Sequence, residues 1–297
     1  MDMNKDGVAV SALYTAGVWQ WAGLSNAELT TPESATGVFR WVNAYMRFYR
    51  WLNPQSYCLR HQLLHRHSAI DHLVKQAHCP RVLEVASGFS PRGAMLSANP
   101  DCHYTEMDLP GMVAHKRLQF QRTAAGEAVL ARPNFTLQAG DITTYDFSAD
   151  AVSKPMTILT EGLMMYFSRS QQLPLWRAIA MRLAKSDGVY IFDYIPLTEE
   201  PARSLLGRVL HNLRVHWFGI AGDFAYDERD REAVARDLQL CGFDDVRCYA
   251  TGEVAQAWNL PAAEVATRTL IYVCRMKNST VSVPATTTAS KKSEQSS

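Results

Sequence analysis

Arg81-Val-Leu-Glu-Val-Ala-Ser-Gly-Phe-Ser-Pro-Arg-Gly93 is the stretch of sequence from which the fold can be predicted. Val82 to Val85 is an apolar run broken only by Glu84, which is typical of a strand buried in a parallel sheet. The small residues around Gly88 predict a tight turn, and a helical pattern begins at Arg92. A strand, a turn and a helix N-terminus in this order let a polar ligand approach the backbone closely. The second glycine of the NAD fingerprint is missing, and Arg92 stands where a ligand carboxylate could be held by two hydrogen bonds.

A second strand pattern follows over 102–109 and ends in Glu106 and Asp108. Asp108 comes 20 residues after Gly88, and an acid at the tip of the second strand can accept hydrogen bonds from both hydroxyls of a ribose. Either motif alone is weak evidence. Together, in this order and at this spacing, they predict a nucleoside site.

The composition of the chain limits which fold, partners and cellular compartment are expected. Its 297 residues are 47% hydrophobic, which suffices for one large α/β domain with an appended subdomain. A net charge of +1 favours neither nucleic acid nor an anionic membrane as partner. The six cysteines form no Cys-x-x-Cys pair, and the sequence shows neither a signal peptide nor a membrane-spanning stretch. We therefore expect a cytoplasmic protein, and the oligomeric state stays open.

Strand and helix patterns alternate from Arg81 to about Ile195, which predicts a Rossmann-like, doubly wound α/β fold with a mostly parallel sheet. The expected strands cover 81–86, 102–109, 134–140, 156–161, 188–195, 246–250 and 269–275. The expected helices cover 91–98, 111–131, 169–185, 199–213 and 227–240, the last ended by Gly242.

Three regions are expected along the chain. Residues 1–78 form a helical, aromatic-rich region whose rings either pack into its own core or line a lid over a ligand. Residues 79–276 form the Rossmann-like domain, with an insertion at 199–226 that contains His216-Trp217-Phe218-Gly219. The low-complexity composition of 277–297 predicts a disordered tail.

The order of these motifs resembles class I S-adenosylmethionine-dependent methyltransferases, more narrowly the leucine carboxyl methyltransferase superfamily, which includes polyketide O-methyltransferases. Residues 86–93 are similar to its Gly-x-Gly-x-Asp-x-Arg turn, and 104–110 to its Glu-x-Asp-x-Pro strand end. Residues 160–167, Thr-Glu-Gly-Leu-Met-Met-Tyr-Phe, are similar to its Glu-Gly-x-x-x-Tyr segment, the most specific match. The resemblance covers roughly residues 80–195. Ser87 replaces the first glycine of the turn, and Ser90 stands where the family has an aspartate.

The resemblance implies S-adenosylmethionine as the cofactor and a set of residues that bind it. Gly88 would admit the cofactor to the backbone, Arg92 would hold the methionine carboxylate, and Asp108 would bind the ribose. Asp141 would reach the adenine amino group, and Ile142 would pack on the ring. The implied cofactor-binding set is Ser87, Gly88, Ser90, Arg92, Asp108, Asp141, Ile142 and Glu161.

The resemblance also implies residues for the chemistry. Glu161 would face the methionine end of the cofactor, and Tyr166 would line the acceptor pocket; these two are the candidate catalytic residues. The predicted substrate contacts are Tyr14, Trp21 and Tyr166.

Some of these residues have a structural alternative. Glu84 and Asp141 are also typical of residues that cap turns. His61, His65, His67 and His72 lack the His-Glu-x-x-His pattern and a nearby cysteine, so we expect packed or solvated histidines and no metal. One of them could still act as a general base.

The implied reaction is methyl transfer to an oxygen or a carboxylate of a small molecule in secondary metabolism. The thioether leaving group needs no acid, and a carboxylate acceptor needs no base, which agrees with a sequence that shows no catalytic dyad. One alternative is a cyclase that releases methylthioadenosine and forms azetidine-2-carboxylate, with the N-terminal aromatic rings around the sulfonium. Another is a regulator that binds S-adenosylmethionine without turnover.

Overall fold

The computed structural model describes residues 10–147, 154–195, 229–277, 279–281 and 284. The predicted helix 199–213 and the segment 216–219 lie outside the described residues. So does most of the tail that begins at residue 277.

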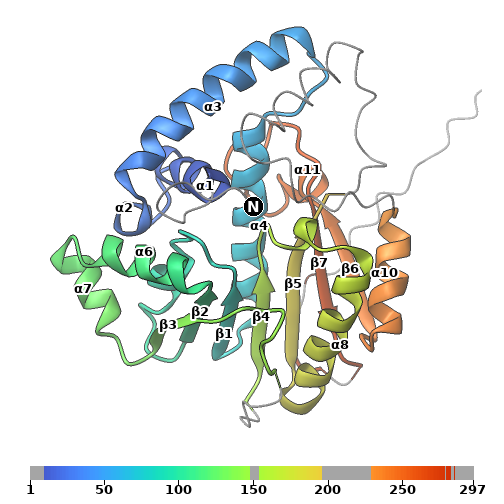
Figure 1. The fold of residues 1–297 in the computed structure, drawn as a ribbon. Helices are drawn as coiled ribbons and strands as arrows, with labels where there is room; N and C mark the ends of the chain where they lie inside the picture. The colour runs from blue at the N-terminus through green and yellow to red at the C-terminus, as the bar shows by residue number, and fades with distance from the viewer. Residues whose placement is uncertain (1–9, 148–153, 196–228, 278, 282–283, 285–297) are drawn as a thin grey trace, which may run out of the picture.

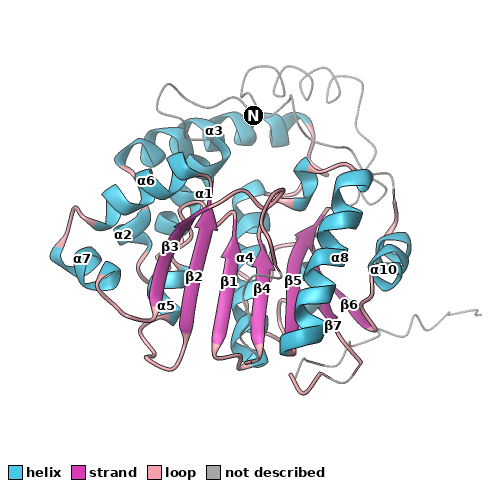
Figure 2. Ribbon diagram, turned by 60° about the horizontal axis from the view of Figure 1, so that its bottom comes forward, coloured by secondary structure: helices cyan, strands magenta, loops and turns pink. Residues whose placement is uncertain are grey.

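A seven-stranded sheet forms the centre of the protein, with the strand order β3-β2-β1-β4-β5-β7-β6 (Figure 2). Strands β1 to β5 run parallel to one another, and β7 runs antiparallel to both β5 and β6. The strands are β1 Arg81–Val85, β2 His103–Asp108, β3 Phe135–Ala139, β4 Met156–Thr160, β5 Gly188–Tyr194, β6 Asp245–Ala250 and β7 Leu270–Arg275. The predicted α/β fold with a Rossmann-like, mostly parallel sheet is confirmed.

The strand order determines where a ligand is expected. The chain runs from β1 outward to β3 on one side of the sheet and then crosses back to β4 on the other side of β1. In open α/β sheets, ligands bind beyond the carboxyl ends of the strands at such a reversal. Figure 2 shows the arrowheads of β1, β2 and β4 pointing toward the end of the sheet where α1 and α3 lie.

Both faces of the sheet are covered by helices, which explains the continuous burial of its central strands. Every residue of β4 and β5 is buried, as expected for parallel strands between two helical layers. One core lies between the sheet and α4 (Leu59–Ala77), and the other lies between the sheet and α8 (Arg169–Ser186). Figure 1 shows these two helices on opposite faces of the sheet.

Helices α1 (Val10–Trp21), α2 (Ala27–Thr30) and α3 (Glu33–Leu52) form a smaller helical layer (Figure 1). Gly17 permits a close crossing of α1 and α3, because a Cβ at Gly17 would lie 2.6 Å from the Cβ of Phe39. This layer has a hydrophobic core of its own that includes Tyr14, Trp19 and Tyr49. The expected helical character is therefore present, while α4, also within residues 1–78, packs on the sheet.

The prediction of one continuous helix over 111–131 is wrong. The structure has α6 (Pro110–Phe120) and α7 (Ala124–Leu130) instead. Helix α6 ends with Gln121 as its C-cap. Thr123 begins α7 as its N-cap, since its hydroxyl accepts a hydrogen bond from Gly126 N at 3.0 Å.

Around the edges of the sheet, short helices and turns complete the fold. The short helical elements are α5 (Arg92–Leu96), η1 (Met164–Tyr166), α10 (Arg231–Leu240) and α11 (Thr251–Val254). Gly242 has a φ of 111° just after α10, which confirms its predicted role in ending the helix. Beyond residue 277, the Thr280 hydroxyl donates to Asp187 at 2.7 Å, and Val281 is buried. The tail therefore keeps order at these residues.

Candidate functional site

The turn after β1 has the left-handed backbone that the sequence predicted, but at one unexpected residue. Gly88 has a φ of 49°, and Ala86 has a φ of 56°, whereas Ser87 is not among the residues with positive φ. Ala86, rather than Ser87, therefore takes the place of the first glycine. A residue with a Cβ pays about 1–2 kcal/mol for this conformation. A hydrogen bond from Ala86 N to Met107 O, at 2.8 Å, holds the turn against β2.

Asp108 lies beside this turn, at the carboxyl end of β2. Its Oδ2 accepts a hydrogen bond from Gly88 N at 2.7 Å, and its Oδ1 accepts one from Leu109 N at 2.7 Å. Burial raises the pKa of Asp108, and the two backbone hydrogen bonds oppose this rise. Each carboxylate oxygen has a further lone pair, so Asp108 can still accept two hydroxyl hydrogen bonds. The structure thus brings together the two residues from which the nucleoside site was predicted.

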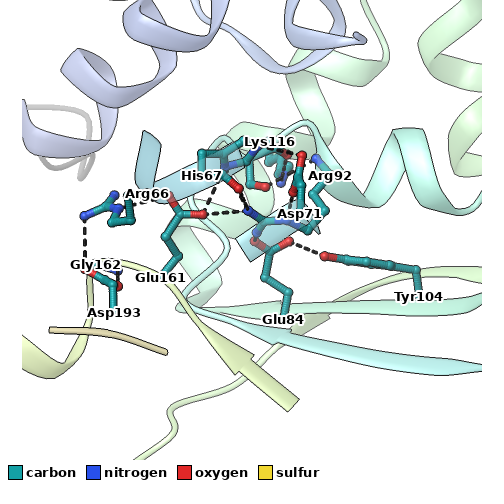
Figure 3. A network of polar contacts seen from close by, with 11 residues as sticks. Arg66, His67, Asp71, Glu84, Arg92, Tyr104, Lys116, Glu161, Gly162 and Asp193 are labelled. Carbon is teal, nitrogen blue, oxygen red and sulfur yellow. Dashed lines mark hydrogen bonds and ion pairs between the residues drawn. The ribbon is translucent and has the colours of Figure 1, made fainter. Parts of the chain in front are cut away.

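Arg92 lies at the centre of a buried charge network (Figure 3). Its guanidinium is fully buried, and its Nε donates to Asp71 Oδ1 at 2.5 Å. Its Nη1 donates to Glu84, and its Nη2 donates to Glu161 Oε2 at 2.8 Å. These carboxylates outweigh the effect of burial and raise the pKa of Arg92 well above its usual value. Arg92 is therefore the counter-ion of three internal carboxylates, and its predicted contact with a ligand carboxylate stays a prediction.

Glu161 follows β4 directly and contacts two further side chains of α4, those of Arg66 and His67. Arg66 Nε lies 3.0 Å from Glu161 Oε1, and His67 Nδ1 lies 3.0 Å from Oε2. Burial alone would raise the pKa of Glu161. Instead, His67, Arg66 and Arg92 hold this pKa well below its usual value, so the carboxylate is ionised.

Several residues of this network were not singled out by the sequence. They come from α1, α4 and β5 and are Trp19, Arg66, Asp71 and Asp193. The available signals were weak: Asp71 is spaced i,i+4 from His67 on one helix, and Asp193 is an acid within an apolar strand.

The four histidines of α4 have different environments. His67 contacts Glu161, and the centroids of the His67 and Trp19 rings are 4.2 Å apart. His65 is buried and contacts the Thr267 hydroxyl at 2.8 Å. His72 stacks on Trp258 at 4.6 Å, and His61 meets Trp21 edge to face at 5.5 Å. Only His67 of the four thus contacts the charge network through the interactions described.

The predicted adenine contacts lie at the end of β3. Asp141 is exposed, and its Oδ1 accepts from both the backbone N and the hydroxyl of Thr143, at 2.9 and 2.7 Å. The structure thus shows the turn cap that was the alternative for Asp141. Ile142 is buried in the same core as Met107. Their adenine contacts stay predictions.

The predicted substrate residues come from α1 and η1, and the two on α1, Tyr14 and Trp21, both stack on Phe39, with ring centroids 5.9 and 6.1 Å from its own. Tyr166 is half-buried in η1, five residues after Glu161. Tyr14 is buried and donates to Asn43 Oδ1 at 3.3 Å. Trp21 is 41% exposed, with the guanidinium of Arg60 4.5 Å from its ring. Trp19, rather than Trp21, is the tryptophan of α1 that contacts the charge network.

A second buried ion pair stabilises the turn after β1. Lys116 of α6 pairs with Glu106 of β2, and each is 1% exposed. Lys116 Nζ also donates to Ser90 O at 2.7 Å, so the pair ties α6 and β2 to the turn. Gly93 leaves the space, because a Cβ there would lie 2.1 Å from Glu106 Oε1. Burial raises the pKa of Glu106 to about 7 although Lys116 opposes the rise.

This pKa predicts a pH-dependent loss of stability that Glu106→Gln should remove. An acid whose pKa is higher in the folded state than in the unfolded state destabilises the fold as pH rises between the two values. The free energy of unfolding of the wild type, relative to Glu106→Gln, should therefore fall from about pH 4.5 to about pH 7 and then level off. Urea unfolding of both proteins at several pH values measures this difference, and a constant or rising difference would contradict it.

Neither a metal cluster nor a membrane span is found in the described part of the chain. No group of three or more histidine, cysteine or acidic side chains is placed there to hold a metal ion. None of the helices in that part has the length and apolar character needed to cross a membrane.

Comparisons with known proteins give structural matches only. No protein-family model matches the chain, and no curated protein matches it. The solved structures that resemble it include PigF with SAH, at 16% identity over 66% of this chain and 50% of that protein, with a TM-score of 0.44. A Nostoc punctiforme protein named as an O-methyltransferase matches at 13% identity over 72% of this chain and 56% of its own, with a TM-score of 0.48.

Human N-acetylserotonin methyltransferase in complex with SAM matches at 13% identity over 89% of this chain and 71% of its own, with a TM-score of 0.48. The chain thus spans about half the length of the first two proteins. At these identities the likeness concerns the fold alone. The strand order of the sheet establishes that fold independently: the protein has a Rossmann-like sheet whose β1 turn, β2 acid and β4 glutamate lie at the same carboxyl end.

Proposed function

We propose that this protein is an S-adenosylmethionine-dependent methyltransferase that acts on an oxygen or a carboxylate of a small molecule. The observation that carries the proposal is the bond of 2.7 Å between Gly88 N and Asp108 Oδ2. It joins the glycine turn to the strand-tip acid at the point where a doubly wound fold receives a nucleoside.

The charge of the site suits the methionine end of this cofactor, which carries a sulfonium and an ammonium. The buried network around Arg92 has more carboxylates than guanidinium groups. Its acids are Asp71, Glu84, Glu161 and Asp193, and its arginines are Arg66 and Arg92. A surplus of buried negative charge is stabilised when a ligand brings positive charge to it. Among these acids, Glu161 is the one that the sequence resemblance places at the methionine end.

The residues of the chain then divide the work of binding. Asp108 would accept the ribose hydroxyls, and the turn of Ser87, Gly88 and Ser90 would admit the cofactor close to the backbone. Asp141 and Ile142 would lie by the adenine. When bound, S-adenosylmethionine supplies a methyl group activated by the sulfonium. The chain contributes orientation, desolvation and electrostatic complementarity, which suffice for a reaction whose leaving group is a neutral thioether.

The acceptor is proposed to be a small molecule of secondary metabolism, with Tyr166 near its position, on the strength of the Glu-Gly-x-x-x-Tyr resemblance. A cytoplasmic location is proposed because all six cysteines are free thiols.

Cyclisation of S-adenosylmethionine to azetidine-2-carboxylate is a second candidate, favoured by one observation. The ring of Trp19 lies 4.2 Å from the ring of His67, which in turn contacts Glu161. An aromatic face this close to the expected methionine end could stabilise a bent sulfonium conformation.

Mass spectrometry of the protein incubated with S-adenosylmethionine separates the two reactions. Alone, the cofactor should give no S-adenosylhomocysteine, because the acceptor is missing. It should also give no methylthioadenosine above its spontaneous breakdown, because a methyltransferase does not promote attack by the cofactor's own amine. An added extract of candidate acceptors should then yield S-adenosylhomocysteine. Asp108→Ala is the matched control and should lower this product.

Two results would change the proposal. Stoichiometric methylthioadenosine together with a four-membered imino acid, formed without an acceptor, would replace methyl transfer by cyclisation. Binding of the cofactor with neither product, across a broad set of acceptors, would favour a regulator.

A further inference from the structure

We propose that Arg66, acting with Asp193 and Gly162, is a positioning unit that fixes the Glu161 carboxylate toward the methionine end of the cofactor. This inference rests on the proposed function. It assigns a role to Arg66 and Asp193, which lie outside the motifs of the sequence, and to Gly162, which lies within the Glu-Gly-x-x-x-Tyr segment.

The contacts of Arg66 close a ring between two strand ends (Figure 3). Arg66 is 6% exposed on α4, and its Nε donates to Glu161 Oε1 at 3.0 Å. Its Nη1 donates to Asp193 Oδ2 at 3.4 Å. The other oxygen of Asp193 accepts from Gly162 N at 2.5 Å. Because Gly162 follows Glu161 directly in the chain, these contacts form a closed ring of Glu161, Arg66, Asp193 and Gly162.

Beyond the last backbone pair of β4 and β5, this ring links the two strands through side chains. Thr160 and Phe192 are the last paired residues of the two strands, so Glu161 and Asp193 come next at adjacent strand ends. Two buried carboxylates at neighbouring strand ends repel each other. Arg66 bonds to both, which converts the repulsion into a bridge with a fixed geometry. Burial and the Glu161 charge raise the pKa of Asp193, while Arg66 and the Gly162 amide oppose the rise.

Gly162 is required by its backbone and by its closeness to Arg66. Its φ is +69°, and a Cβ there would lie 3.1 Å from Arg66 Nη1 and 3.2 Å from Nη2. A side chain at this position would strain the backbone and press on the guanidinium. The glycine of the Glu-Gly-x-x-x-Tyr segment thus makes room for the arginine.

The ring leaves Glu161 able to bind a ligand. Oε1 accepts one described hydrogen bond, from Arg66, and a carboxylate oxygen can accept two. The carboxylate is therefore held in place and ionised, with a lone pair for a ligand N–H donor such as the methionine ammonium.

The test compares two ligands that differ only at the methionine end. Calorimetric titrations of S-adenosylmethionine and of methylthioadenosine, which lacks the amino-acid group, are run on the wild type, Arg66→Lys and Asp193→Asn. Arg66→Lys keeps the charge but loses the two-pronged geometry. Its affinity for S-adenosylmethionine should fall about tenfold, because a displaced Glu161 loses one charge-assisted hydrogen bond to the methionine ammonium. Its affinity for methylthioadenosine should change by less than about twofold. Asp193→Asn should show the same selectivity with a smaller loss.

Arg275→Lys is the matched control, since Arg275 makes a similar pair with Asp245 at the far edge of the sheet. It should leave the affinities for both ligands unchanged. In the double variant of Arg66 and Asp193, the losses should be less than additive, because the two residues act as one unit.

Each outcome decides one claim. If Arg66→Lys lowers both affinities equally or neither, the positioning role is overturned. If it does not fold, as thermal unfolding will show, the same comparison is made with Asp193→Asn, where selective loss supports the role and equal or absent loss overturns it. If the wild type binds neither ligand, it is the proposed function that fails.

Discussion

Replacing Arg92 by methionine should lower the free energy of unfolding by about 3–5 kcal/mol, the usual penalty for leaving buried charges without their partner. Arg92 is fully buried and donates to Asp71, Glu84 and Glu161. Methionine fills much of the same volume but leaves these carboxylates without their shared cation. Urea unfolding with circular dichroism measures the loss.

The pH dependence of this loss provides its control. Without Arg92, the pKa of the buried Glu161 carboxylate, which Arg92 helps to lower, should rise in the folded state. Such a group destabilises the fold increasingly as pH rises, so the loss should be smaller at pH 5 than at pH 8. Arg92→Lys, which keeps the charge, should lose less than Arg92→Met at pH 8. A methionine variant as stable as the wild type at pH 8 would show that Arg92 does not hold the network together.

Asp108→Ala should weaken the binding of S-adenosylmethionine about ten- to a hundredfold, because the ribose loses an acceptor of charge-assisted hydrogen bonds worth about 1.5–3 kcal/mol. The protein should stay folded, since Asp108 is only half-buried at the end of β2. The Gly88 amide also loses its acceptor, so the turn should become less ordered. Calorimetric titration measures the affinity.

Asp101→Ala is the matched control for this prediction, because Asp101 is an exposed aspartate of the turn before β2. Its removal should leave the affinity unchanged. Equal affinities for the wild type and Asp108→Ala would remove Asp108 from the cofactor site.

The sheet could be predicted from the sequence because its signals are local. The apolar run of β1, the acid at the end of β2 and the alternation of strands with helices each occupy one continuous segment. The break between α6 and α7 was missed because the helical pattern continues through it. Only the hydroxyl of Thr123, which caps the second helix, marks the break.

The charge network could be predicted only in part. Glu161 and Arg92 were found by resemblance to known motifs. Their partners on α4 are distant in sequence: Asp71 and Arg92 are separated by 21 residues, and Arg66 and Glu161 by 95. Nothing local in the sequence shows that α4 packs on the sheet with this face toward β1 and β4. The role of Arg92 as an internal counter-ion thus depends on tertiary packing.

The turn after β1 shows a similar limit. Its small residues predicted a tight turn, and Gly88 has the left-handed backbone expected of a glycine. The second residue with a left-handed backbone is Ala86, and an alanine in the sequence does not indicate this conformation. The stability of the surrounding strands, including the bond from Ala86 N to Met107 O, imposes this conformation.

The proposed function depends most on S-adenosylmethionine binding at the carboxyl ends of β1, β2 and β4. Calorimetric titration of the wild-type protein with S-adenosylmethionine tests this directly. We expect saturable binding with one site per chain, competed by S-adenosylhomocysteine. No detectable heat and no competition, with the protein shown to be folded and the ligand raised to millimolar concentrations, would contradict it.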